Sequence, residues 1–116
     1  MAKIFDMYGL DCDDLDQARV TVEAALSVGF ELRDSLYWGG AYYLARAPEY
    51  GKIAIRSNLN TFTGKLGEPE SPGSRFLVAV SEPPDPDLVK ERLVGAGLQF
   101  LRRDEVSPTR DRLARE

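Results

Sequence analysis

The densest group of chemically active side chains lies at residues 11–16, where "DCDDLD" places four aspartates around a single cysteine. Aspartates at the start of a helix accept hydrogen bonds from its free N–H groups and suit the positive end of its dipole. Four carboxylates exceed that need, so they could instead attract the lysines and arginines of a basic partner. A calcium loop is a poor match, because the EF-hand glycine and distal glutamate are missing. The candidate docking residues are Asp11, Asp13, Asp14 and Asp16.

The sequence contains no histidine and only one cysteine, Cys12. The commonest general base, the usual metal ligand and the Ser-His or Cys-His nucleophile pair are therefore missing. The carboxylates beside Cys12 should raise the pKa of its thiol, which disfavours a nucleophilic thiolate. We therefore expect no enzyme, no metal site and no cofactor. A catalyst based on Glu31 or Glu49 would need a dry pocket, which their spacing does not predict.

Aromatic side chains gather at residues 37–44, "YWGGAYYL", which include the only tryptophan. They could form cross-strand pairs that stabilise a hairpin, or a contact surface for a partner. Because side chains alternate between the two faces of a strand, we expect part of the group in each role. Tyr37, Tyr43 and the nearby Tyr50 are the candidate contact residues. Asn58 and Asn60 could hydrogen-bond a partner or their own turns.

The elements that must position these residues follow from hydrophobic periodicity and turn residues. The pattern predicts two helices, over residues 11–29 and 83–97. Gly29 is expected to supply the left-handed stop of the first helix, and Asp85 with Pro86 to begin the second. Strands are predicted at residues 2–10, 30–38, 41–47, 51–58, 75–82 and 98–106. Residues 57–74 lack any sustained period and indicate a long surface loop, either functional or disordered.

This order predicts an α+β fold: two β-α-β units around a mostly antiparallel sheet of five to six strands, with both helices on one face. Residues 1–106 are expected to form a single domain, and residues 107–116 a polar, frayed tail. No apolar run approaches the roughly 18 residues needed to cross a membrane. The N-terminal segment also lacks the apolar stretch of a signal peptide, so we expect a cytoplasmic protein, as a monomer or weak homodimer.

Charge is unevenly distributed along the chain. The formal net charge is −4, and residues 1–35 contain eight acidic and three basic side chains, a local net of −5. An acidic surface repels phosphate backbones, so nucleic acid is not an expected partner. A basic protein is the favoured partner instead.

Two stretches resemble modules of a known superfamily. The segments "DLDQARVTVEAALSVGFELRDS" and "GGAYYLARAPEYGKIAIRS" look like a half-module of the vicinal oxygen chelate superfamily, the glyoxalase and bleomycin-resistance group. "DPDLVKERLVGAGLQFLRRDE" is similar to the opening of a second module. The metal-bearing positions of that family hold no histidine here, so the resemblance implies a small-molecule binder without metal. Its cavity would lie between the two β-α-β units and would be open, because the closing strands of the second module are missing.

The whole chain also resembles small bacterial immunity proteins, the cytosolic inhibitors of toxins from contact-dependent and related competition systems. The likeness is one of type: a short, acidic α+β chain without catalytic residues. It implies a non-catalytic module that neutralises a basic bacterial toxin by occluding its active site. The aspartates would steer the toxin, and the tyrosines would pack against it. This is our leading hypothesis, and the small-molecule binder is the alternative.

Overall fold

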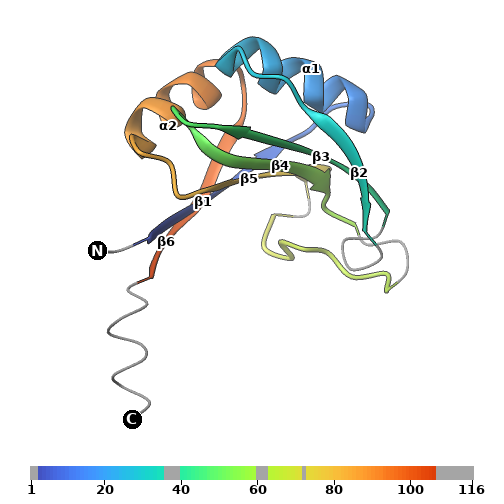
Figure 1. Cartoon of the computed structure of the whole chain (residues 1–116). Coiled ribbons are helices and arrows are strands. Elements are labelled where there is room, and N and C mark those ends of the chain that lie inside the picture. The colour runs from blue at the N-terminus through green and yellow to red at the C-terminus, as the bar shows by residue number, and fades with distance from the viewer. Residues whose placement is uncertain (1–2, 36–39, 60–62, 72, 107–116) are drawn as a thin grey trace.

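The computed structural model describes residues 3–35, 40–59, 63–71 and 73–106. The helices are α1 (Leu15–Leu26) and α2 (Pro86–Gly95). The strands are β1 (Lys3–Leu10), β2 (Glu31–Ser35), β3 (Gly40–Ala47), β4 (Gly51–Ser57), β5 (Phe76–Ser81) and β6 (Gln99–Val106). The strands form one open antiparallel sheet, which confirms the predicted α+β class (Figure 1).

The strand order across the sheet is β2-β3-β4-β5-β1-β6, and every neighbouring pair is antiparallel. It follows that β5 and β6 run parallel to each other on either side of β1, with α2 as their connection. β1 and β2 are also parallel, but β5, β4 and β3 lie between them. Leaving out the β2-β3 hairpin, the rest follows the ferredoxin-like β-α-β-β-α-β arrangement. The hairpin therefore extends that arrangement at one edge.

Both helices begin at the aspartates that the sequence indicates. The Asp14 carboxylate accepts a hydrogen bond from the Gln17 N–H at 2.7 Å, and the Asp85 carboxylate accepts one from the Leu88 N–H at 3.1 Å. The expected left-handed stop at Gly29 is wrong. Ser27 takes that conformation instead, with φ 56°, and its N–H donates to the Glu23 carbonyl. The left-handed backbone at Ser27 turns the chain out of the helical path, so α1 ends at Leu26 rather than at Gly29.

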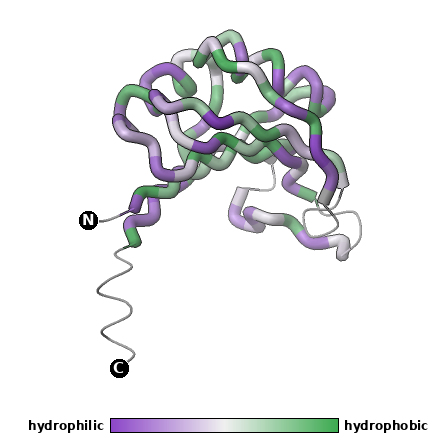
Figure 2. The backbone as a smooth tube through the Cα atoms, in the orientation of Figure 1, coloured by the Kyte–Doolittle hydropathy of each residue, from purple (hydrophilic) through white to green (hydrophobic). Residues whose placement is uncertain are grey.

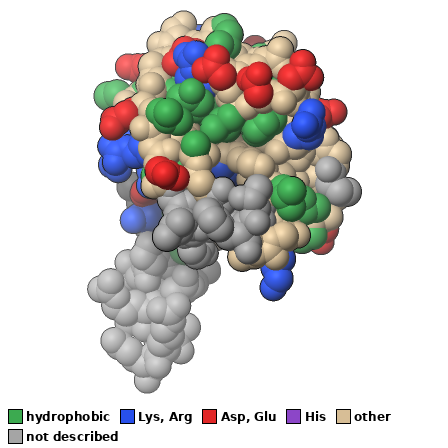
Figure 3. Space-filling view, turned by 90° about the vertical axis from the view of Figure 1, so that its right-hand side faces the viewer, with side chains coloured by type: hydrophobic (Ala, Val, Ile, Leu, Met, Phe, Trp, Pro, Cys, Tyr) green, Lys and Arg blue, Asp and Glu red, His purple; other side chains and the backbone are tan. Residues whose placement is uncertain are grey.

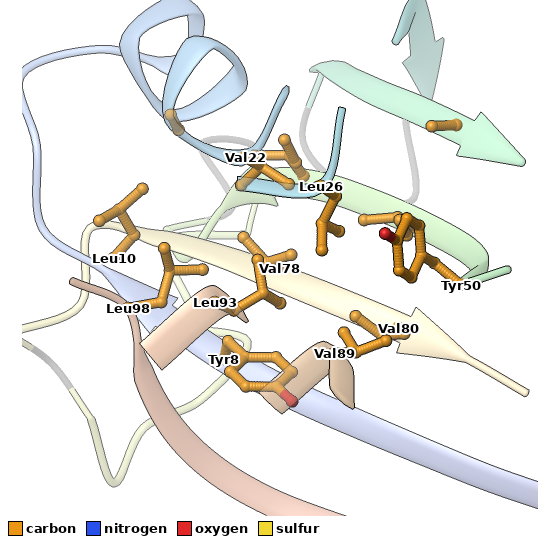
Figure 4. Close-up of a cluster of buried hydrophobic side chains, with 14 of the residues drawn as sticks. Tyr8, Leu10, Val22, Leu26, Tyr50, Val78, Val80, Val89, Leu93 and Leu98 are labelled. Atoms are coloured by element: carbon orange, nitrogen blue, oxygen red, sulfur yellow. The ribbon is translucent and has the colours of Figure 1, made fainter. Parts of the chain in front are cut away.

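The main hydrophobic core lies between the helices and one face of the sheet, which we call the core face. Strand register aligns Tyr8, Val78 and Ile55 on this face. Figure 4 shows the side chains of Val22, Leu26, Val89 and Leu93, from α1 and α2, gathered with those of the strands. In Figure 1 both helices lie above the sheet.

The opposite face, which we call the loop face, carries a second apolar row. Met7, Ala79, Ala54 and Leu44 lie side by side across four strands. The loop between β4 and β5 runs below the sheet in Figure 1 and covers part of this face. A Cβ atom at Gly9 would lie 2.1 Å from the Ser74 Oγ, so only glycine lets the loop approach β1 so closely. Figure 2 shows hydrophobic stretches along the central strands, which lie between the helices on one side and the β4–β5 loop on the other.

Candidate functional site

The aspartates that the sequence singles out lie together at the start of α1. We call Asp11, Asp13, Asp14 and Asp16 the acidic end, and all of them are exposed. Figure 3 shows acidic side chains gathered along the upper part of this side of the molecule, where α1 lies. Asp14 caps the helix, whereas no hydrogen bond or ion pair within the described part of the chain engages the carboxylate of Asp11 or Asp13. Half of the acidic end therefore stays available for a partner.

Asp16 joins the acidic end to one of the predicted tyrosines. Its carboxylate pairs with the Arg19 guanidinium at 2.8 Å and accepts a hydrogen bond from the Tyr43 hydroxyl at 3.2 Å. The Arg19 guanidinium also lies 5.5 Å from the centre of the Tyr43 ring and pairs with Glu23 at 2.8 Å. The hydrogen bonds from Arg19 and then Tyr43 hold the pKa of Asp16 below its ordinary value. The structure thus brings Asp16 and Tyr43 together, as a packed cluster beside the free carboxylates.

A hollow of about 490 Å³ opens next to Asp11, and we call it the polar hollow. Its walls come from the end of β1, the β4–β5 loop and the start of β6, at one end of the sheet. The lining residues are Gly9, Asp11, Glu70, Ser71, Gly73, Ser74, Gly97 and Gln99. Two carboxylates therefore face one hollow together with hydroxyl and amide groups. These are the groups that accept hydrogen bonds from a lysine or arginine side chain.

Glu70 is the member of this site that the sequence did not indicate. It lies in a loop without periodicity, so nothing in the local pattern places it near Asp11. The structure explains why Glu70 and Asp11 line the same hollow, because buried Asn58 holds the loop on the sheet. Its amide nitrogen lies 2.8 Å from the Ser74 carbonyl and 3.1 Å from the Ser71 carbonyl, and its Oδ1 accepts the Glu68 N–H at 2.8 Å.

Asn58 and Tyr50 therefore serve the fold. Asn58 is 2% exposed and Tyr50 is 8% exposed, and Tyr50 belongs to the main core. Both residues are largely enclosed by the fold, so neither is counted among the contact residues. Tyr37 and Asn60 lie outside the described residues, as do Trp38 and the tail at 107–116.

The lone thiol is an unpromising nucleophile. Burial raises the pKa of Cys12, and the carboxylates of Asp14, Asp13 and Asp11 add to that shift. The direction agrees with the sequence-based expectation, although burial is the larger cause. Across the described ranges, no group of three or more histidine, cysteine, aspartate or glutamate side chains is placed to hold a metal ion. Neither described helix combines the length and apolar character needed to cross a membrane.

Comparison with known proteins finds no matching family model, no matching curated protein and no matching solved structure. The function therefore has to be argued from the site itself.

Proposed function

We propose that this protein is a non-catalytic binding module whose acidic end docks a basic protein. The observation that supports this most directly is the position of Asp11. It belongs to the exposed acidic end and, with Glu70, also lines the polar hollow. A surface of this kind attracts a basic partner at long range and then accepts one of its side chains.

The polar hollow gives the contact its chemistry. A lysine or arginine that enters it meets the carboxylates of Asp11 and Glu70, with Ser71 and Gln99 as further hydrogen-bond acceptors. Exposed Asp13 adds negative charge to the acidic end, and Tyr43 next to Asp16 offers an aromatic edge. Aromatic and arginine contacts often carry most of the energy of such interfaces.

The finer proposal is that the module is an immunity protein that occludes the active site of a basic bacterial toxin. Its support is the resemblance of type to such proteins, together with the charge of the acidic end. A nuclease toxin must present cations to bind phosphate groups, and those cations are complementary to this surface. A protein seated on them would block the substrate without any chemistry of its own.

The alternative of a small-molecule binder gains no specific support. The resemblance implies a cavity between the two β-α-β units, whereas side chains of both helices and the sheet pack together there into a core (Figure 4). The hollows that the described residues form lie at the surface of the fold instead.

The test is capture and affinity measurement with a matched pair of variants. The protein is used to capture partners from its native cells, and the captured protein is then purified and titrated calorimetrically. The double variant Asp11→Asn/Glu70→Gln should bind at least about tenfold more weakly. Asp34→Asn/Glu91→Gln, which removes the same charge elsewhere on the exposed surface, should bind as the wild type does. Wild-type affinity should also fall steeply with added salt.

An acidic partner, or equal losses in the two double variants, would contradict the docking proposal. For the finer proposal, the captured partner should be toxic when expressed alone and harmless when co-expressed with this chain. A basic partner without toxicity would leave the docking surface standing and remove the immunity role.

A further inference from the structure

A second, oppositely charged site lies on the loop face. Strand register places Arg46 of β3 directly opposite Lys52 of β4, and both side chains are exposed. Ser81 of β5 and Phe5 of β1 continue the same row across the sheet. Two cations therefore stand next to each other at one end of a row whose neighbours are a hydroxyl and an aromatic ring.

Neither cation is neutralised inside the described part of the chain. No hydrogen bond or ion pair there engages the side chain of Arg46 or Lys52. Of the nearby carboxylates, Glu31 pairs with Arg33 at 3.3 Å and Glu82 pairs with Lys3 at 3.5 Å, whereas Glu49, in the turn between the two strands, forms no ion pair with either cation. Like charges that are directly opposite in a sheet destabilise it, so the fold gains nothing from this pair.

The two cations border a hollow of about 490 Å³. Its other walls come from Ala47, Pro48 and Gly51 in the turn between β3 and β4, from Ser81 at the end of β5, and from Glu82, whose carboxylate pairs with Lys3. Apolar walls next to two unpaired cations are suited to a group that joins a carboxylate to a short hydrocarbon chain. The side chains of glutamate and aspartate are of that kind.

We propose that Arg46, Lys52 and this hollow form a binding site for an acidic segment of another protein. Charge complementarity selects the occupant, because two adjacent unpaired cations match consecutive carboxylates. A nucleic acid fits less well, since a chain of net charge −4 repels phosphate backbones and the site offers only two free cations. The site lies on the face of the sheet opposite the helices, so it is separate from the acidic end and independent of the function proposed above.

The probe is a fluorescein-labelled, glutamate-rich peptide that contains two leucines, titrated with the whole chain by fluorescence anisotropy. Arg46→Ala/Lys52→Ala should weaken its binding on the order of tenfold or more, because each side chain contributes a charge-assisted bond. Lys65→Ala/Arg92→Ala is the matched control. It removes the same charge from exposed positions in the loop and on α2, and it should leave the affinity unchanged.

Thermal unfolding of both double variants confirms that they are folded before the comparison is made. Three outcomes of the binding experiments would overturn the proposal: no saturable binding of the peptide, an equal loss in the control variant, or tighter binding of an oligothymidylate of the same charge. Sedimentation equilibrium tests whether a second copy of this chain occupies the site. Self-association of the wild type that Arg46→Ala/Lys52→Ala abolishes would assign the face to a second copy and would also overturn it.

Discussion

Arg103 of β6 and Asp6 of β1, 97 positions apart in the chain, are joined by two hydrogen bonds of 2.9 and 3.0 Å. The Asp6 side chain is fully buried, and about a quarter of the Arg103 side chain is exposed. Arg103 also reaches Asp87 at 3.3 Å and lies over the Phe100 ring. This ion pair therefore ties the edge strand β6 to its neighbour and to the start of α2.

Replacing Arg103 should be among the most damaging single changes. Arg103→Met keeps the hydrocarbon stem but leaves the Asp6 carboxylate buried without its partner, at a cost of about 3–5 kcal/mol. Urea unfolding measures this cost. Lys3→Met breaks the half-exposed pair with Glu82 and should cost less than about 1 kcal/mol. Similar costs for the two variants would show that burial does not set the importance of the Asp6–Arg103 pair.

Tyr8 presents the opposite case, a buried polar atom without a partner. Its side chain is fully buried, and its hydroxyl has no hydrogen bond within the described residues. Tyr8→Phe should therefore leave the free energy of unfolding unchanged or raise it, by up to about 1 kcal/mol. A loss of more than about 1 kcal/mol would mean that a bound water satisfies the hydroxyl.

The same variant tests how the stability of the fold depends on pH. Burial, and next the Asp6 carboxylate, raise the pKa of Tyr8 above its ordinary value of 10.0. The unfolded chain therefore ionises first as the pH rises, so this contribution to stability is present below pH 10.0 and is lost above it. Wild type should lose more stability than Tyr8→Phe between neutral pH and about pH 11.

Even the closest substitution of Asn58 should destabilise the fold. Asn58→Ala removes the hydrogen bonds to the Ser71 and Ser74 carbonyls and the one from the Glu68 N–H, at a cost of about 2–4 kcal/mol. Asn58→Asp keeps the shape but turns a carboxylate toward those carbonyls, so at neutral pH it should cost at least as much. Unlike Asn58→Ala, it should recover as the pH falls and the carboxyl gains a proton. Urea unfolding at several pH values separates the two variants.

The sequence predicts the elements well and their neighbours poorly. Capping by Asp14 and Asp85 and the alternation of Ile53 and Ile55 are local properties, so these elements follow directly from the pattern. The insertion of β1 between β5 and β6 depends on long-range pairing that no local window contains. The two β-α-β units were therefore predicted without their actual spacing in the sheet.

The residues of the candidate site also include some that the sequence predicts and some that it does not. The acidic end was visible as a run of aspartates, but Glu70 reaches the polar hollow only through the loop that Asn58 holds. The sequence predicts Tyr50 as a contact residue, and it leaves Asn58 open between a partner and its own turns. Burial decides between these roles, and single residue types do not report it.

Asp16 should make the stability of the α1 start depend on pH. Hydrogen bonds from Arg19 and Tyr43 lower its pKa in the folded state, so its contribution is present above the ordinary value of 3.8 and is lost as the pH falls through the lower folded value. Asp16→Asn should therefore be less stable than wild type at neutral pH, with the difference shrinking in acid. Asp34→Asn, at an exposed position on β2, is the control for the loss of one surface charge. A difference that persists unchanged in acid would contradict the ionic origin.

Lys52 should show a conflict between stability and binding. Lys52→Glu replaces two like charges on opposing strands by an attractive pair with Arg46, so the free energy of unfolding should rise by up to about 1 kcal/mol at low salt. High salt should remove the gain, because both side chains are exposed. Lys52→Gln removes the repulsion without adding attraction and should fall between the two. The proposed carboxylate site should lose affinity in the same order, since each change weakens the attraction for an acidic segment. If Lys52→Glu destabilised the sheet, Lys52 would have a structural role, and the argument that the fold tolerates this pair for the sake of binding would fail.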